Sequence, residues 1–357
     1  MGGADAASRR DTLVERLFES TLGAWDLFGV YLGDRLGLYR ALADRGPLTS
    51  AELAEATGTH ERYVREWAEQ QATAGILEAD GDGRFVLPDG HDEALLDEAS
   101  LNYIAPIAKL VVACTEPLPA LLGAFRSGEG VPYSDYGANL HEGQAAFTRP
   151  MFEQLLGNEW LPSIPDVHER LQGDPPARVA DVACGAGHSS QAIARAYPKV
   201  HVDGIDSDEA SIDEARKHLA GSDVADRVTF HHRDAADARF AHRYHLVYVH
   251  ESLHDMSFPV EVLRACRELL ADGGSVVVGD ERVADRFAPP GDDLERFYYG
   301  FSLLHCLPVG MVGEGAAGTG AVMRVDTVRR YAQEAGFEHF DVLPIENDFY
   351  RFYRLAP

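Results

Sequence analysis

A turn that contains two glycines is the feature of this sequence best suited to bind a small molecule. Residues 179–188 read VADVACGAGH and lead from a short apolar run into a helical pattern. Glycines at a strand-to-helix turn let a ligand approach the backbone, and they leave N–H groups of the helix pointing at it. Two phosphate-binding motifs are excluded, because Ser190 stands where a dinucleotide fingerprint needs Gly or Ala and no Lys completes a Walker loop.

Three aspartates follow neighbouring apolar runs and could surround the same ligand. Asp181 lies within the turn, Asp206 ends the second run, and Asp234 follows the third. A carboxylate at the end of the second strand can accept both hydroxyls of a ribose. We expect Asp234 to accept from the exocyclic amine of an adenine. A cationic ligand that contains adenosine and no phosphate suits these acids, and a doubly wound domain with tight turns and no cofactor is the alternative.

These residues resemble the class I S-adenosylmethionine-dependent methyltransferases, whose first motif runs D-x-G-x-G-x-G. Ala183 replaces the first glycine of that motif, a departure that is compatible with cofactor binding. The resemblance covers roughly residues 178–355. It implies that Asp181 lies near the methionine amino group, Asp206 on the ribose and Asp234 at the adenine. We assign these residues to the site of S-adenosylmethionine: Asp181, Cys184, Gly185, Gly187, Asp206, Asp234, Ala235 and His250.

The segment His250-Glu-Ser-Leu-His254 matches the zinc-protease motif H-E-x-x-H. That motif needs both histidines on one face of a helix, so that they reach a single metal ion. Here an apolar run over 244–249 leads directly into the motif, and Pro259 opens the next helical segment. We therefore expect a strand end and a loop, and we predict no metal site.

The pair His254-Asp255 gives this loop a second interpretation. Loops that follow parallel strands face the ligand crevice, so this loop lies beside the cofactor. In natural-product O-methyltransferases a His-Asp pair occurs at this place and its His is the general base, while an acid that matches Glu281 orients it. An imidazole with a pKa of about 6.5 suits removal of a phenol or alcohol proton. His254 and Glu281 are the predicted catalytic residues, and methyl transfer by proximity alone is the alternative.

The pattern of elements predicts an α/β fold. From residue 178 onward apolar runs alternate with helical segments, which is typical of a doubly wound, mostly parallel sheet, and the resemblance implies a Rossmann-like sheet of seven strands. Before it, three helical segments and a hairpin follow each other in the order of a winged helix-turn-helix. We predict a helical winged-helix and dimerisation domain at 1–90, a helical linker and substrate-pocket segment at 91–173, and the S-adenosylmethionine-binding domain at 174–357.

Charge excludes several classes of partner. The 357 residues carry a formal net charge of −26, which repels phosphate backbones and anionic lipid surfaces. Acidic residues also outnumber basic ones in the expected recognition helix and wing, so we predict no nucleic-acid and no membrane partner. In related methyltransferases the winged helix mediates dimerisation, which implies a homodimer. Four scattered cysteines and charged residues within the first apolar stretch predict a reduced, cytoplasmic protein without a secretory signal.

Aromatic residues of the middle segment and of the insert before the last helix suggest an apolar or aromatic acceptor. The whole chain resembles actinobacterial natural-product methyltransferases, which implies O-methylation of a small molecule with His254 as general base. N- or C-methylation by proximity, and a methyltransferase-fold protein without transfer activity that serves as a sensor, regulator or rearrangement catalyst, are the alternatives. The candidate substrate residues are Tyr133, Tyr136, Phe147, Met151, Trp160, Tyr298 and His305.

Overall fold

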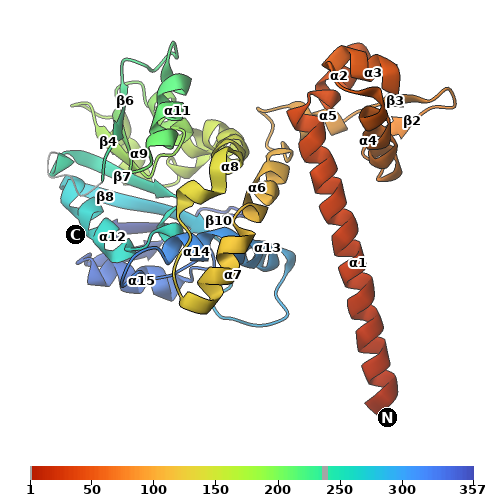
Figure 1. Cartoon of the computed structure of the whole chain (residues 1–357). Helices are drawn as coiled ribbons and strands as arrows, with labels where there is room; N and C mark the ends of the chain where they lie inside the picture. Colours follow the sequence, from red (N-terminus) through yellow and green to blue (C-terminus); the bar gives the residue numbers. More distant parts are fainter. Residues whose placement is uncertain (1, 235–239) are drawn as a thin grey trace. The chain divides into compact units, whose positions relative to one another are not determined.

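The chain folds into two compact units, which are described separately here. The computed structural model describes residues 2–234 and 240–357 (Figure 1). Residues 1–112 and 142–150 form the first unit, and residues 113–141 and 151–357 form the second. Residues of the predicted middle segment, 91–173, contribute to both units. The three-segment division stays a prediction.

The first unit is a winged helix preceded by a long helix. Its elements are α1 (Gly2–Arg35), α2 (Leu38–Arg45), β1 (Leu48–Thr49), α3 (Ser50–Thr57), α4 (Glu61–Thr73), β2 (Glu78–Ala79), β3 (Arg84–Val86) and α5 (His91–Leu96). The three short strands pair antiparallel in the order β1-β3-β2. A capping box opens α3, because the Thr49 side chain accepts from the Glu52 N–H and the Glu52 carboxylate accepts from the Thr49 N–H. Trp67 fixes α4 against α1 by donating its indole N–H to the Gly29 carbonyl at 2.8 Å.

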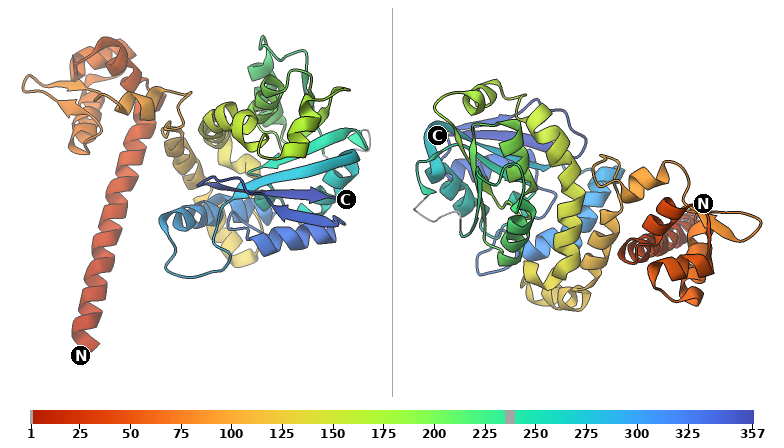
Figure 2. Two further views of the ribbon diagram at one scale, coloured as in Figure 1. Left: turned by 180° about the vertical axis from the view of Figure 1, so that it is seen from behind. Right: turned by 90° about the horizontal axis from the view of Figure 1, so that it is seen from above.

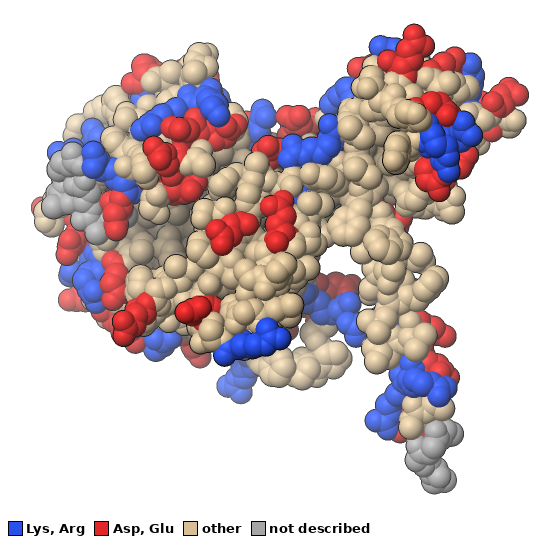
Figure 3. Space-filling view, viewed as in Figure 1, with Lys and Arg blue, Asp and Glu red and all other residues tan. Residues whose placement is uncertain are grey.

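Much of α1 extends beyond the core of this unit. Leu17, Phe18, Leu22 and Trp25 recur at helical spacing along it, and all of them are exposed, with Phe18 64% accessible. Figure 3 shows the middle of this helix as a stretch without charged side chains. An apolar stripe on a helix is normally buried against another element.

The second unit contains the predicted sheet. Its seven strands are β4 (Arg178–Val182), β5 (His201–Asp206), β6 (Val228–His232), β7 (Tyr244–His250), β8 (Leu270–Glu281), β9 (His339–Val342) and β10 (Tyr350–Ala356). Their order is β6-β5-β4-β7-β8-β10-β9, and only the pairings of β10 with β8 and β9 are antiparallel. The predicted doubly wound, mostly parallel seven-stranded fold with a helical winged-helix part before it is confirmed.

Helices cover both faces of this sheet, as the views in Figure 2 show. Alternate residues of β4 point to opposite faces, so Val179 joins one hydrophobic core while Ala180 and Val182 join the other. The helices between and after the strands are α10 (His188–Ala196), α11 (Glu209–Leu219), α12 (Pro259–Leu269), α13 (Asp293–Phe301), α14 (Leu307–Gly310) and α15 (Val325–Glu334), with the short helices η4 (Leu253–Asp255) and η5 (Ser302–Cys306).

Helical segments precede the first strand of the sheet. They are α6 (Pro106–Thr115), α7 (Leu118–Ser127), η1 (Tyr133–Tyr136), α8 (Gly137–Met151), η2 (Phe152–Trp160) and α9 (Pro165–Gln172). Among the described residues, no single helix has the length and apolar character to cross a membrane, whereas the bent pair α6 and α7 has both when taken together. All four cysteines are buried and free.

Candidate active site

The turn after β4 adopts the left-handed backbone that its glycines predict. Gly185 and Gly187 have φ angles of 50° and 77°, and Ala183, in the place of the first glycine of the family motif, has a φ of 57°. The Ala183 N–H donates to the Ile205 carbonyl at 2.8 Å, which ties the turn to β5. A Cβ placed on Gly185 would meet no heavy atom within 4 Å. The backbone at Gly185 is therefore open to a ligand.

Gly187 has a different reason to be glycine. A Cβ at this position would lie 2.3 Å from the Phe230 ring, and a Cβ on Gly204 of β5 would lie 2.5 Å from the same ring. Phe230 of β6 thus fills the space that side chains at both glycines would need. No pattern in the sequence indicated this packing. The expected contact of Gly187 with the cofactor stays a prediction.

Asp181 is a buried carboxylate close to the carboxyl end of β4. Its Oδ2 accepts hydrogen bonds from the hydroxyls of Ser189 and Ser190, both at 2.6 Å. Burial raises the pKa of Asp181 to about 6, even though the two hydroxyls favour the charged form. Within the described residues no Lys, Arg or His forms an ion pair with this carboxylate, so a bound cation would stabilise its charge.

Asp206 connects β5 to the glycine turn. Its Oδ2 accepts from the Gly185 N–H and its Oδ1 from the Asp208 N–H, each at 2.9 Å, and burial raises its pKa. The Arg233 N–H donates to the Asp206 carbonyl at 2.8 Å, which brings the exposed residue Asp234, after β6, to the same edge of the sheet. The ends of β4, β5 and β6 therefore meet as expected. Ala235 lies outside the described residues, and Cys184 is buried in the turn.

These features fit S-adenosylmethionine. Asp181 is a carboxylate whose ionisation a cation would favour, Asp206 is a hydrogen-bond acceptor, and the backbone of Gly185 is open beside it. The roles of the individual residues stay predictions.

His254, in η4, is surrounded by three carboxylates. Its Nδ1 lies 2.8 Å from Asp280 Oδ1 and 2.8 Å from Glu281 Oε2, while its Nε2 lies 3.1 Å from Asp255 Oδ1. Burial by itself lowers the pKa of His254, but the charges of Glu281, Asp255 and Asp280 together outweigh burial and raise it well above the usual value. The predicted base and the predicted orienting acid are thus in contact. Asp280 is a further partner of His254 that was not expected from the sequence.

His305, in η5, faces the other side of Asp255. Its Nδ1 is 3.8 Å from Asp255 Oδ2, and its ring packs edge-on against Tyr136 at 4.6 Å and Tyr133 at 5.8 Å between ring centres. Although burial favours the neutral acid, the imidazoles of His254 and His305 lower the pKa of Asp255 to about 2. The structure therefore brings together three of the predicted substrate residues: Tyr133, Tyr136 and His305.

The other predicted substrate residues have different surroundings. Trp160 is buried in the core, where it packs on Phe352 and His250, and Met151 packs against the same core. Tyr298 is buried and donates its hydroxyl to the Phe349 carbonyl. Phe147, in α8, belongs to the first unit. Contact with substrate stays a prediction for all four.

The two histidines of the H-E-x-x-H segment do not converge. His250 is the last residue of β7. Its Nδ1 and the Tyr248 hydroxyl share a hydrogen bond of 2.8 Å, and its ring stacks on Trp160 with 5.4 Å between the ring centres. Burial lowers its pKa to about 3, so it is neutral. The expected strand end and loop are confirmed, whereas the expected contact of His250 with the cofactor stays a prediction.

Among the described residues, two groups of potential metal ligands include His254. They are His254 with Asp280 and Glu281, and His254 with Asp255 and Cys306. His254 Nδ1 and Asp280 Oδ1 already share a hydrogen bond of 2.8 Å, so a proton accounts for that contact without an ion. The absence of a metal site stays a prediction.

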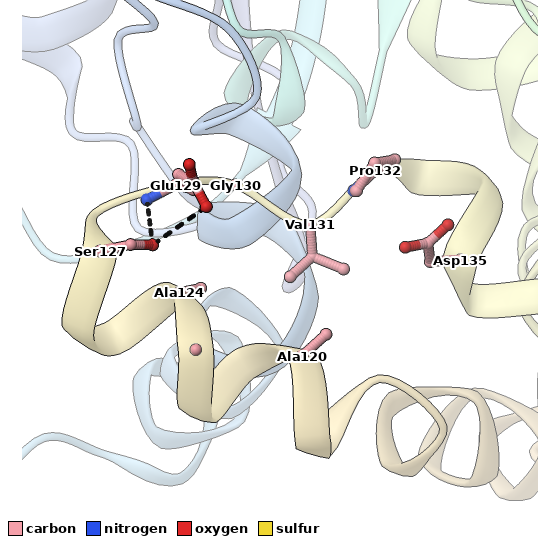
Figure 4. Close-up of a pocket in the computed structure, with 9 residues that line it drawn as sticks. Ala120, Ala124, Ser127, Glu129, Gly130, Val131, Pro132 and Asp135 are labelled. Carbon is pink, nitrogen blue, oxygen red and sulfur yellow. Dashed lines mark hydrogen bonds between the residues drawn. The ribbon is translucent and has the colours of Figure 1, made fainter.

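A cavity of about 300 Å³ lies along α7 and the loop that follows it. Figure 4 shows Ala120 and Ala124 on the helix side, with Val131 and Asp135 across from them. Its lining residues are Ala120, Gly123, Ala124, Ser127, Glu129, Gly130, Val131, Pro132 and Asp135. They include none of the predicted cofactor or substrate residues.

Comparison with known proteins identifies two domains. Residues 179–274 match the methyltransferase domain family, and residues 27–97 match the Rv2258c-like winged HTH domain. The 27-O-demethylrifamycin SV methyltransferase of Amycolatopsis mediterranei is 28% identical over 208 residues, which are 57% of this chain and 68% of that protein. The mitomycin biosynthesis 6-O-methyltransferase of Streptomyces lavendulae is 25% identical over 222 residues, 57% of this chain. The match spans only 59% of that relative's length.

Solved structures share the fold over nearly the whole chain. The mitomycin 7-O-methyltransferase MmcR superposes with a TM-score of 0.71 at 20% identity, covering 98% of this chain and 99% of that one. Human N-acetylserotonin methyltransferase in complex with SAM gives a TM-score of 0.70 at 16% identity, covering 100% and 99% of the two chains. At these identities the likeness shows the fold.

Proposed function

We propose that this chain, an S-adenosylmethionine-dependent methyltransferase with an N-terminal winged-helix domain, methylates a hydroxyl oxygen of a small, largely apolar molecule. The observation that carries the proposal is the meeting of the buried Asp181 and the half-buried Asp206 with an open glycine backbone at one edge of the sheet. The names of two curated relatives, a 27-O-demethylrifamycin SV methyltransferase and a mitomycin biosynthesis 6-O-methyltransferase, support oxygen as the acceptor atom.

The chain's own residues suit the cofactor in distinct ways. Asp181 would accept from the ammonium group of the methionine part, and Asp206 from the ribose hydroxyls. The open side of Gly185 leaves room for the ligand against the backbone. When bound, S-adenosylmethionine supplies an electrophilic methyl group on a sulfonium sulfur. Cys184, Gly187, Asp234, Ala235 and His250 are the remaining proposed neighbours.

Transfer to a hydroxyl also requires a proton acceptor. We propose His254 as the base and Glu281 as the acid that orients it, and the contact between them at 2.8 Å supports an orienting role for Glu281. For His254 to act, its Nε2 must exchange Asp255 for the hydroxyl of the acceptor. His305 is the second imidazole of this cluster. The aromatic rings of Tyr133 and Tyr136 beside it suit an aromatic or apolar acceptor.

A radiochemical assay tests this function. The protein is incubated with methyl-labelled S-adenosylmethionine and a panel of phenols, naphthols and hydroxyquinones, and labelled ethers are separated from labelled amines and C-methyl products. We expect label in ethers and none with Asp206→Ala. Label in amine or C-methyl products would contradict oxygen as the acceptor atom, and S-adenosylmethionine binding without any transfer would favour a protein that has lost this activity.

We also propose that the protein is a homodimer held together through α1. A single chain leaves Leu17, Phe18, Leu22 and Trp25 exposed along this helix, and a contiguous apolar surface of that kind is typical of an interface. A second copy would present the same stripe, so the interface would be self-complementary. A cytoplasmic location and the absence of nucleic-acid and membrane partners stay predictions, in keeping with the acidic charge.

A further inference from the structure

The loop that carries His254 has few hydrogen bonds of its own. Its helical part, η4, is three residues long, and the N–H groups of Asp255 and Met256 donate within the loop at 3.0 Å and 3.4 Å. The loop begins at Glu251, which has a φ of 51° and donates its N–H to the Gly279 carbonyl of β8 at 2.8 Å. A single turn of 3₁₀ helix is held by few and poorly aligned hydrogen bonds. Beyond its start, the loop therefore depends on contacts from another segment.

The glycine-rich segment 311–320, which follows α14, provides these contacts. The Gly320 N–H donates to the His254 carbonyl at 3.1 Å, and the Ala317 N–H donates to the Ser257 carbonyl at 2.8 Å. Two hydrogen bonds thus join the two backbones side by side. One of them ends on the residue that we propose as the base.

Gly320 has to be glycine to make its contact. Its φ is 72°, in the left-handed region that residues with a side chain rarely adopt. A Cβ at this position would lie 2.4 Å from the Ser302 Oγ of η5, and Ser302 is itself buried. A side chain would therefore push the Gly320 N–H away from the His254 carbonyl.

Gly315, in the same segment, has the same backbone conformation without the contact. Its φ is 80°, it is exposed, and a Cβ placed on it would meet no heavy atom within 4 Å. Alanine at Gly315 or at Gly320 therefore causes left-handed strain. Only the substitution at Gly320 also disturbs the backbone of His254, so an experiment can separate the two effects.

We propose that Gly320 is a positioning residue for methyl transfer, because its N–H fixes the backbone of His254 and with it the distance from the imidazole to the acceptor hydroxyl. Asp280 and Glu281 hold the Nδ1 side of the ring at 2.8 Å, and the contact from Gly320 holds its backbone. A misplacement of about 1 Å can cost about 100-fold in rate. This inference rests on the proposed O-methylation with His254 as its base, and it identifies a contact that holds that base in place.

The test compares two acceptors that differ in their need for a base. One is a phenol that is methylated in the radiochemical assay, and the other is its polyfluorinated analogue, which is already ionised at the pH of the assay. We expect Gly320→Ala to lower kcat for the phenol by about 10- to 100-fold, and kcat for the ionised analogue by less than about threefold. The matched control Gly315→Ala should keep both rates.

Two kinetic results would overturn the proposal. An equal loss of kcat with both acceptors would indicate a general structural defect, and an unchanged kcat with the phenol would show that the contact does not position the base. If Gly320→Ala does not fold, Gly320→Asn takes its place with the same expectations, because asparagine adopts left-handed angles more readily than alanine.

Histidine NMR tests the contact without any acceptor. The full-length protein is labelled with 15N-histidine and measured with and without S-adenosylhomocysteine, and His254 is assigned with His254→Gln. We expect the ring resonances of His254 to shift in Gly320→Ala and to stay at their wild-type positions in Gly315→Ala. Ring resonances that do not move in Gly320→Ala would overturn the proposal. Failure of the proposed function gives a different result, because the wild-type protein would then methylate neither acceptor, while the ring resonances could still be compared.

Discussion

Replacing Asp181 by Asn should stabilise the protein without ligand and weaken its cofactor binding. The folded-state pKa of Asp181 is about 6, which lies above its unfolded value of 3.8. Folding therefore favours the protonated acid, and the ionised form costs stability. The cost is absent below pH 3.8, grows as the pH rises, and is complete above pH 6. A difference of this size corresponds to about 3 kcal/mol.

An asparagine at position 181 removes that cost. Its amide oxygen can still accept from the hydroxyls of Ser189 and Ser190, so the hydrogen bonds of the turn are kept. We expect Asp181→Asn to be more stable than the wild type by up to about 3 kcal/mol at pH 8, and equally stable near pH 4. A neutral amide no longer attracts the ammonium group of the cofactor, so affinity should fall by about tenfold or more.

Asp203 provides a matched control on the neighbouring strand. Burial raises the pKa of Asp203, but His231, Arg178 and Tyr244 contact its carboxylate and lower the pKa below its usual value. Its contribution is therefore present above the unfolded pKa and is lost as the pH falls through the folded pKa. Asp203→Asn should destabilise the protein at pH 8 by on the order of 2 kcal/mol, the opposite sign to Asp181→Asn.

Urea unfolding between pH 4 and 8, followed by circular dichroism at fixed protein concentration, measures both effects, and calorimetry with S-adenosylhomocysteine measures the affinity. An Asp181→Asn protein that is less stable than the wild type at pH 8 would refute the reasoning on burial. Undiminished cofactor affinity would refute the role of Asp181 toward the amino group.

Four further substitutions test the turn and the proposed dimer. Gly187→Ala should lower the free energy of unfolding by about 2–4 kcal/mol, because it causes both left-handed backbone strain and a clash with Phe230. Gly185→Ala causes the strain alone and should mainly weaken cofactor binding. Similar losses of stability for the two variants in urea titrations would contradict this difference. Ala183→Gly relieves a φ of 57° and should raise the free energy of unfolding by about 1 kcal/mol, and a lower free energy of unfolding would show that the strain is absent. Phe18→Glu should convert the dimer to monomer in light-scattering measurements, and an unchanged mass would place the interface elsewhere.

Much of the sheet edge that we propose binds the cofactor was predictable, because it depends on the backbone conformation of one turn and on where the strands end. The glycines stand at a strand-to-helix turn and the acids at the ends of successive strands, so both can be located from the pattern of apolar runs. Parallel pairing then brings those strand ends to one edge of the sheet. Asp181 and Asp206 meet the turn for this reason. The apolar run over residues 244–249 likewise identified β7, and with it the loop that carries His254.

What could not be predicted depends on packing between distant segments. Nothing near Gly187 in sequence indicates that Phe230 fills the space beside it, and nothing near His254 indicates that His305 and Asp280 complete its surroundings. Aromatic residues were an ambiguous signal, because Trp160 in the core and Tyr133 beside His305 look alike in a sequence. Side-chain burial decides between these roles.

Calorimetry of S-adenosylhomocysteine binding is the decisive test of the proposed cofactor site. We expect one site per chain, an affinity about 100-fold weaker in Asp206→Ala, and an unchanged affinity in Asp341→Ala, an exposed acid on the edge strand β9. A wild-type protein that releases no heat, or an Asp206→Ala protein that binds as tightly as the wild type, would contradict it.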